Sequence, residues 1–205
     1  MRLTAVTLFL LASTFPLGAV AQARWPADQD AYQLVPGKPA PAPACRLVTP
    51  IVTTDSLGPV RPGMRLRDLL RACPRAYLGW HWEEGIPEPT AAVRLGSVLA
   101  FAILQDTAAA KAVVYRVLIA DSSARTVEGI GPGSRLSEMI RAWGLPKLGA
   151  AECSLYAWFD ARPHLSWIME FPSKWDCGRL ERFVADSTAD HLPSELRAGM
   201  AILGR

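Results

Sequence analysis

The chain has 205 residues and a formal net charge of +3, from 22 Lys and Arg against 19 Asp and Glu. Its arginines are scattered among acidic residues rather than gathered in a basic stripe, so a nucleic-acid partner is not expected. Half of the residues are hydrophobic, and roughly 180 residues after a leader suit one compact domain or two small ones.

The first 23 residues predict a secretory signal peptide. Arg2 precedes an apolar run over residues 3–15, and Ala21-Gln22-Ala23 has the small-x-small pattern of a cleavage site. The apolar run is too short for a bilayer, which takes about 20 residues, and no later stretch qualifies. We therefore expect a periplasmic or secreted protein that does not insert into a membrane once the signal is cleaved.

Residues 24–44 predict an extended tether between the leader and the folded part. This segment has few large apolar residues. Proline-rich segments of this kind are extended and build no core. The prolines are Pro26, Pro36, Pro39, Pro41 and Pro43.

A stretch of eleven residues occurs twice, at 62–72 and again at 132–142. Six of the eleven positions are identical, and in each copy a Pro-Gly turn precedes apolar residues at the i, i+3, i+4, i+7 spacing of one helical face. This repeat predicts two copies of one structural unit, each beginning with an amphipathic helix. The apolar positions are Leu66, Leu69, Leu70 and Cys73 in the first copy and Leu136, Met139, Ile140 and Trp143 in the second.

Apolar stretches around the first helix predict strands. Residues 47–54 are rich in β-branched side chains, and residues 77–82, 93–104 and 112–120 are apolar. A polar turn at 105–107 predicts that the last two stretches form a long hairpin.

The second half predicts a similar order of elements. Residues 155–159 and 164–171 predict a hairpin, because apolar and polar side chains alternate along the latter. A short strand is predicted at 180–184. The helical spacing of the apolar residues in the tail predicts a closing helix from residue 194.

These elements predict an α+β protein of two tandem repeats. We expect each repeat to consist of one helix packed on a roughly three-stranded antiparallel sheet. The first repeat would span residues 45–121, and the second would span residues 122–205 and end in the C-terminal helix.

The four cysteines predict two disulfides. Four cysteines allow three connectivities, but each repeat holds two of them, so we expect Cys45 to pair with Cys73 and Cys153 with Cys177. A metal site and a free nucleophilic thiol are the alternatives. The lack of a Cys-x-x-Cys pair and the oxidising compartment disfavour both.

The second copy of the repeat resembles a known helix signature. Residues 133–146 read Gly-Ser-Arg-Leu-Ser-Glu-Met-Ile-Arg-Ala-Trp-Gly-Leu-Pro. This is similar to the Gly-Met-Ser/Thr-x-x-Glu-Val and Leu-Gly-x-Pro signature of the BamE/SmpA-type outer-membrane assembly lipoproteins, and to the related β-lactamase inhibitor proteins. The first copy keeps Gly63-Met64 but ends in Cys73-Pro74. The resemblance implies an exported fold of helices on a small antiparallel sheet that binds other proteins, here without a lipid-anchor cysteine.

The segment at residues 80–89 has no counterpart in the second repeat and predicts a partner-binding loop. It combines rigid aromatic rings with acidic residues and prolines, a composition typical of binding hot spots and functional loops. Alternatively, Trp80 and Trp82 stand two positions apart and would both point into the core if the segment is a strand. The predicted contact residues are Trp80, His81, Trp82, Glu83 and Glu84.

The sequence predicts no catalytic residue, metal site or cofactor. His81, His164 and His191 lie far apart without a metal-ligand spacing, and no Gly-x-Ser-x-Gly motif occurs. The glycine-rich stretch at 129–134 is disfavoured as a phosphate site because Pro132 lacks an N–H group.

The sequence therefore favours an exported, non-enzymatic module that binds an envelope protein or peptide, like an assembly factor or an inhibitor. The alternative is a small-ligand-binding protein or hydrolase with a pocket between the repeats that uses His81 and Glu83 or Glu84. A purely structural envelope protein is a third interpretation. The partner and the oligomeric state stay open.

Overall fold

The computed structural model describes residues 45, 50–74, 76–83, 86–108, 110–170, 176–186, 192–193 and 195–204. The predicted signal peptide and tether, together with Glu84 and His191, lie outside these residues. None of the helices in these ranges combines the length and the apolar character that crossing a bilayer requires.

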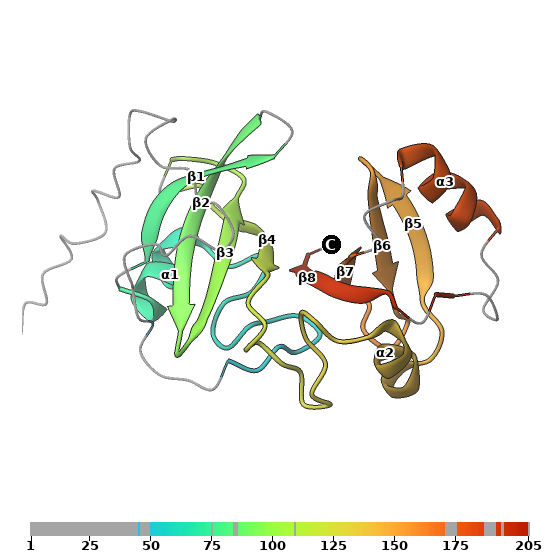
Figure 1. Ribbon diagram of the computed structural model, residues 1–205. Helices are drawn as coiled ribbons and strands as arrows, with labels where there is room; N and C mark the ends of the chain where they lie inside the picture. The colour runs from blue at the N-terminus through green and yellow to red at the C-terminus, as the bar shows by residue number, and fades with distance from the viewer. Residues whose placement is uncertain are drawn as a thin grey trace, which may run out of the picture.

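Within the described ranges, one antiparallel sheet of eight strands organises the molecule (Figure 1). The strand order is β1-β2-β3-β4-β8-β7-β6-β5, so the last strand of each half meets its counterpart at the centre. The strands are β1 (Tyr77–Glu83), β2 (Ile86–Leu95), β3 (Val98–Leu104), β4 (Val114–Ile119), β5 (Lys147–Ala151), β6 (Ser154–Trp158), β7 (Leu165–Glu170) and β8 (Arg197–Leu203). The helices are α1 (Leu66–Ala72), α2 (Leu136–Trp143) and α3 (Cys177–Asp186).

The predicted fold of two separate helix-on-sheet repeats is wrong. The described strands form a single sheet, and four strands rather than about three belong to each half. The halves join where Leu118 in β4 pairs with Ile202 in β8. The edge strand of an isolated repeat would leave a row of backbone groups unpaired, and the β4–β8 pairing satisfies them at the centre of one sheet.

Both copies of the repeat form the helices that their apolar spacing predicts. α1 buries Leu66 and Leu69, and α2 buries Leu136, Met139 and Trp143. These helices are only two turns long, and helices this short depend on packing of their apolar face for most of their stability.

In each half the repeat is anchored to the last strand of that half. The N–H of Gly63 donates to the Val114 carbonyl oxygen in β4 at 2.7 Å, and the N–H of Gly133 donates to the Ala198 carbonyl oxygen in β8 at 2.5 Å. Both glycines have a positive φ, 81° and 89°, which a residue with a side chain adopts only at a cost. The duplicated Pro-Gly turn therefore has the same structural role twice.

Two segments near the C-terminus form the opposite element from the one predicted. Residues 180–184, predicted as a strand, lie in α3, where Leu180 is buried. The tail, predicted as a helix from residue 194, forms β8 between β4 and β7. Hydrogen-bond partners on both sides outweigh the local helical spacing of the tail.

The other strand predictions are partly confirmed. β3 pairs with β4 and β6 pairs with β7, as predicted. The segment predicted as a loop at 80–89 is a hairpin of β1 and β2, and the apolar stretch at 93–104 divides at Gly96 into β2 and β3. The sequence does not predict β5, because Lys-Leu-Gly-Ala-Ala lacks the β-branched and aromatic residues that favour strands. Of the strand predicted at 47–54, residues 51 and 52 form isolated bridges.

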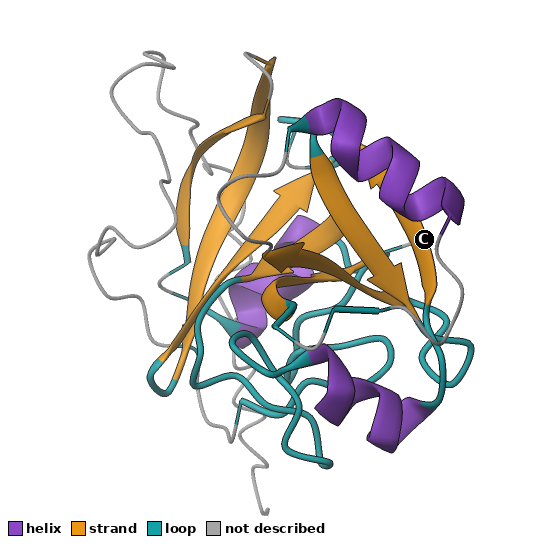
Figure 2. Ribbon diagram, turned by 45° about the vertical axis from the view of Figure 1, so that its right-hand side comes forward, coloured by secondary structure: helices purple, strands orange, loops and turns teal. Residues whose placement is uncertain are grey.

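The described helices share one core with one face of the sheet. Leu69 of α1, Met139 of α2 and Leu180 of α3 belong to a single cluster with inward residues of the strands, such as Val93 and Trp167. α2 and α3 lie at opposite ends of the second half (Figures 1 and 2). The described helices therefore do not cover the other face of the sheet.

Both predicted disulfides are present, Cys45 with Cys73 and Cys153 with Cys177. The first is buried, with 7% and 0% of the two residues exposed, whereas both cysteines of the second are exposed. Disulfides persist in oxidising compartments, so the pair fits a protein outside the cytoplasm.

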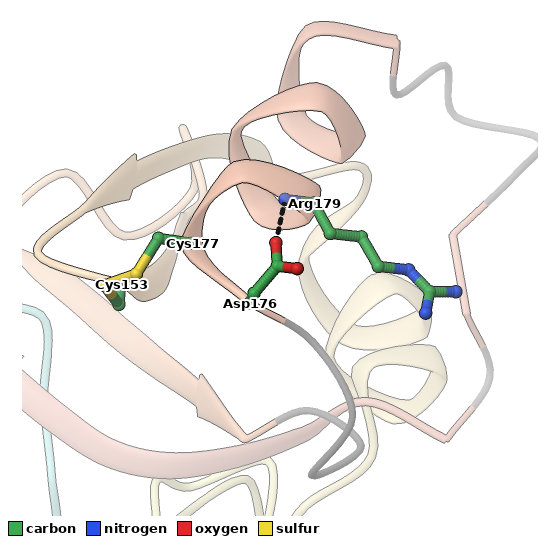
Figure 3. The surroundings of a disulfide bond; sticks show 4 residues. All are labelled: Cys153, Asp176, Cys177 and Arg179. Carbon is green, nitrogen blue, oxygen red and sulfur yellow. Dashed lines mark hydrogen bonds between the residues drawn. A yellow bond between two sulfur atoms is a disulfide. The ribbon is translucent and has the colours of Figure 1, made fainter.

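The start of α3 is fixed in two ways (Figure 3). Cys177, its first residue, is tied to Cys153 in the tight turn between β5 and β6. Asp176 accepts a hydrogen bond from the Arg179 N–H at 2.7 Å, which satisfies a donor that the first turn of a helix leaves unpaired. The disulfide ties the start of α3 to the turn between the two strands that this helix contacts, β5 and β6, and the Asp176 bond stabilises its first turn.

Candidate functional site

The sheet face away from α1, α2 and α3 carries one continuous row of side chains. Each member pairs directly with the next on the neighbouring strand, and the row crosses the sheet from β1 to β5. We call this side the helix-free face, because the described helices bury their apolar residues on the other one. The row is Tyr77, Ala92, Phe101, Leu118, Ile202, Ser166, Trp158 and Lys147.

In the first half, the helix-free face forms a small second core. Phe101, Ile103 and Leu118 are buried in it. The ring of His81 stacks on Phe101, with centroids 6.5 Å apart and 16° between the planes. His81 is thus held beside an apolar cluster, on the body of a strand rather than at a loop tip.

An ion pair joins two strands of this half. Arg116 in β4 donates through Nη2 to Oε2 of Glu88 in β2 at 2.6 Å, across the intervening β3. The two side chains are 19% and 26% exposed. Burial lowers the pKa of Arg116, against the opposing influence of Tyr156 and Glu152, and burial raises the pKa of Glu88. The pair holds a guanidinium group in a partly dehydrated position near the β4–β8 junction.

A pocket of about 290 Å³ opens where β4, β6, β7 and β8 come together. We call it the junction pocket. Its lining combines the aromatic Tyr115 and Trp158 with the polar Arg116, His164 and Ser166. Tyr115 is 46% and Trp158 38% exposed, which is unusual for large aromatic side chains.

Trp158 is positioned by the strand beside it. Its ring lies so close to Gly149 in β5 that a Cβ on that glycine would come within 2.7 Å of the ring atom Cη2. Because Gly149 has no side chain, the indole can pack directly against the backbone of β5. A ring supported in this way loses little conformational freedom when a ligand binds.

Tyr115 stands at an irregularity of β4. Ile103 pairs with Arg116 and Leu104 with Val114, so Tyr115 is an extra residue in its strand. The Arg116 guanidinium lies 5.8 Å from the centre of the Tyr115 ring, within the range of a cation–π interaction. The bulge thus brings an aromatic side chain next to the cation of the pocket.

The polar groups of the pocket suit ligand binding. The Ser166 hydroxyl has a long 3.5 Å contact with the carbonyl oxygen of Ile202, and His164 is exposed. Among the described residues, no group of three or more His, Cys, Asp and Glu side chains is arranged to hold a metal ion. The junction pocket therefore offers hydrogen-bonding groups and aromatic surface to a ligand.

The structure separates the residues of the predicted contact loop. Trp80 and Trp82 lie on the helix-bearing face of β1, and Trp80 is buried, at 9% exposure. His81 lies on the helix-free face. Glu83 ends β1, but its side chain and all of Glu84 lie outside the described residues. None of the described members of this set lines the junction pocket.

Sequence reasoning missed the aromatic residues of the pocket, although one signal existed. In β6, Leu155 and Ala157 point into the core, so Trp158 occupies a position that is normally polar. An aromatic residue out of phase in this way indicates a surface role. Tyr115 gives no such signal, because only the bulge exposes it.

A second ionic cluster, none of whose members is in the lining of the junction pocket, connects segments that lie far apart in the sequence. Arg162 pairs with Glu128, donates to Oγ1 of Thr54 at 3.1 Å, and lies 5.6 Å from the centre of the Trp143 ring. Partial burial acts to raise the pKa of Glu128, but hydrogen bonds, first from Thr126, and the charge of Arg162 lower it overall. Because this cluster joins segments from distant parts of the chain, we assign it a structural role.

The fold is similar to that of the uncharacterized protein YfeY from Escherichia coli. The crystal structure of YfeY matches 76% of this chain and 99% of its own, with a TM-score of 0.51 and 14% sequence identity. At that identity the likeness shows the fold alone. The sequence matches no known protein family and no curated protein. The resemblance to the BamE/SmpA-type and inhibitor proteins stays a prediction.

Proposed function

We propose that this protein is a non-catalytic binding module of the cell envelope and that it holds a protein or peptide partner at the junction pocket. The observation that carries the proposal is the exposure of Tyr115 and Trp158 beside Arg116 in one pocket. Trp, Tyr and Arg are the residue types most enriched at binding hot spots.

The rigidity of the pocket supports this proposal. Tyr115, Arg116, Trp158 and Ser166 belong to strands of a continuous sheet, and His164 directly precedes β7. Trp158 rests on Gly149, and Arg116 is held by Glu88. A pre-arranged site spends less of its interaction energy on ordering side chains when the partner binds.

The proposed location in the cell envelope is supported by two features. The predicted signal peptide at residues 1–23 would direct the chain to the periplasm or beyond, and the two disulfides are consistent with an oxidising environment. An envelope protein or peptide is therefore the class of partner that this module would meet.

Site-specific photo-crosslinking tests the proposal. The crosslinking residue p-benzoylphenylalanine is placed at Trp158 in one variant and at Val127, which is 76% exposed, in the control. We expect position 158 to give a discrete crosslinked partner in the envelope and position 127 to give none. The same partner should disappear from position 158 when Tyr115→Ala is added. Equal crosslinking from both positions would contradict the proposal.

A further inference from the structure

The junction pocket is small for a ligand site. Its volume of about 290 Å³ lies just under the range of roughly 300–1,000 Å³ that small-ligand pockets occupy. Its aromatic residues, Tyr115 and Trp158, come from different halves of the chain, and Leu165 and Ile202 add apolar surface. One aromatic or branched aliphatic side chain would bury its surface against these groups.

Among the described residues that line the pocket, none is acidic. Arg116 supplies a cation, and His164 and Ser166 supply polar groups that can donate hydrogen bonds. Glu88, which pairs with Arg116 at 2.6 Å, does not line the pocket. A ligand that carries a negative charge next to its apolar group would match this arrangement.

One chemical group has both features on the same carbon atom. The last residue of a polypeptide carries its side chain and its free carboxylate on one Cα, so both fit in a space of one residue. An internal Asp or Glu lacks the apolar side chain, and an internal aromatic residue lacks the charge.

We propose that the junction pocket binds the carboxy-terminal residue of a partner chain, with a large apolar side chain against Trp158 and Tyr115 and the carboxylate toward Arg116 and Ser166. This inference rests on the proposed function, because it names the chemistry of the partner at the same site. It adds that recognition depends on a free C-terminus, which an internal epitope does not offer.

Two tripeptides test the inference on the full mature chain. Acetyl-Gly-Ala-Phe with a free carboxylate and the same peptide with a C-terminal amide differ only in the terminal group, which is charged in the first and neutral in the second. Their affinities can be compared by isothermal titration calorimetry. We expect the acid to bind at least tenfold more tightly than the amide. Equal affinities, or no binding of the acid at millimolar concentration, would overturn the inference.

Matched variants show whether binding takes place in this pocket. Trp158→Ala and His164→Gln should each weaken binding of the acid severalfold or more, whereas Trp82→Ala and His81→Gln, outside the pocket lining, should not. Far-ultraviolet circular dichroism checks that each variant folds. A loss of affinity in Trp82→Ala equal to that in Trp158→Ala would contradict the assignment.

The ion pair gives a test that is specific for the carboxylate. Because removing Arg116 alone would leave Glu88 buried without its partner, the double variant Glu88→Gln with Arg116→Gln is the appropriate form. It should bring the acid and the amide to similar affinity. Retained preference for the acid in this variant would remove Arg116 from the proposal.

The outcomes separate the two proposals. If crosslinking at position 158 captures a partner but the acid and the amide bind alike, the binding function stands and the C-terminal specificity fails. If neither position 158 nor the peptides give a specific signal, both fail.

Discussion

The indole ring of Trp158 lies against Gly149 on the adjacent strand, so closely that any side chain at position 149 would have to displace it. This contact links the edge strand β5 to the junction pocket, because the same ring forms part of the lining. The orientation of an exposed aromatic residue is thus decided by the lack of a side chain on its neighbour.

Gly149→Ala should therefore displace the ring. A Cβ at 2.7 Å from Cη2 must move the ring outward, with an expected loss of about 1 kcal/mol in the free energy of unfolding and weaker binding of the acid tripeptide. Chemical denaturation and calorimetry measure the two effects. The control is Gly178→Ala, whose Cβ would meet nothing closer than 3.5 Å; a binding loss in this control would argue against a local effect.

Arg162→Ala should destabilise the protein far more than removal of an exposed cation. Arg162 and Glu128 are 23% and 30% exposed, and the change leaves Glu128 without its cationic partner, so we expect a loss of about 2 kcal/mol. The control is Lys147→Ala, which removes an exposed pair with Asp160 and should cost less than about 1 kcal/mol. Urea denaturation compares the two variants, and similar losses would show that the Arg162 cluster is not a structural brace.

The disulfide Cys153–Cys177 should be reduced before Cys45–Cys73. Reductant reaches exposed sulfur atoms more easily than buried ones, and only Cys45 and Cys73 are buried. Limited dithiothreitol treatment, alkylation and mass spectrometry identify the order of reduction. Replacing Cys153 and Cys177 by Ser should lower the free energy of unfolding by about 3 kcal/mol. Simultaneous reduction of both bridges would indicate that the first is reached by unfolding.

Asp121→Asn should remove a pH-dependent part of the stability. Partial burial acts to raise the pKa of Asp121, but hydrogen bonds from Ser123 and from the Leu99 N–H outweigh it, so the folded pKa lies below the ordinary value of 3.8. The stabilisation is therefore present above about pH 4 and is lost as the pH falls through the folded pKa.

At pH 7 this variant should lose about 1 kcal/mol after allowance for solvent screening, whereas below the folded pKa it should resemble the parent protein. Thermal denaturation across the acid range measures the difference. The control is Asp160→Asn, in an exposed pair with Lys147. A loss in Asp121→Asn that is independent of pH would assign the effect to packing instead.

The sequence predicted the parts of the fold that depend on near neighbours. The helices at Leu66–Ala72 and Leu136–Trp143 follow from a Pro-Gly turn and a regular apolar spacing. The duplicated glycines make equivalent hydrogen bonds in both halves because the same local sequence requires the same turn. The secondary-structure predictions for β8 and for residues 180–184 were wrong because each of these short segments is compatible with both helix and strand.

The candidate site was hidden from sequence reasoning for a related reason. The predicted contact residues stood out by composition, but Trp80 is buried. Tyr115 and Trp158 lie far apart in the chain and meet only because β4 pairs with β8, β8 with β7 and β7 with β6. No pattern within a short stretch of the sequence reveals that these two residues line the same pocket.

By itself, the sequence determined the amphipathic helices and the glycine turns, because each depends on residues a few positions apart. It also determined the two disulfides, whose cysteines lie 28 and 24 residues apart within the same half. Only the tertiary structure decided that the two halves share one sheet and that a pocket forms where they join. Pairing between β4 and β8 depends on backbone hydrogen bonds, which every non-proline residue can offer, so side-chain identity does not reveal the partner strand in advance.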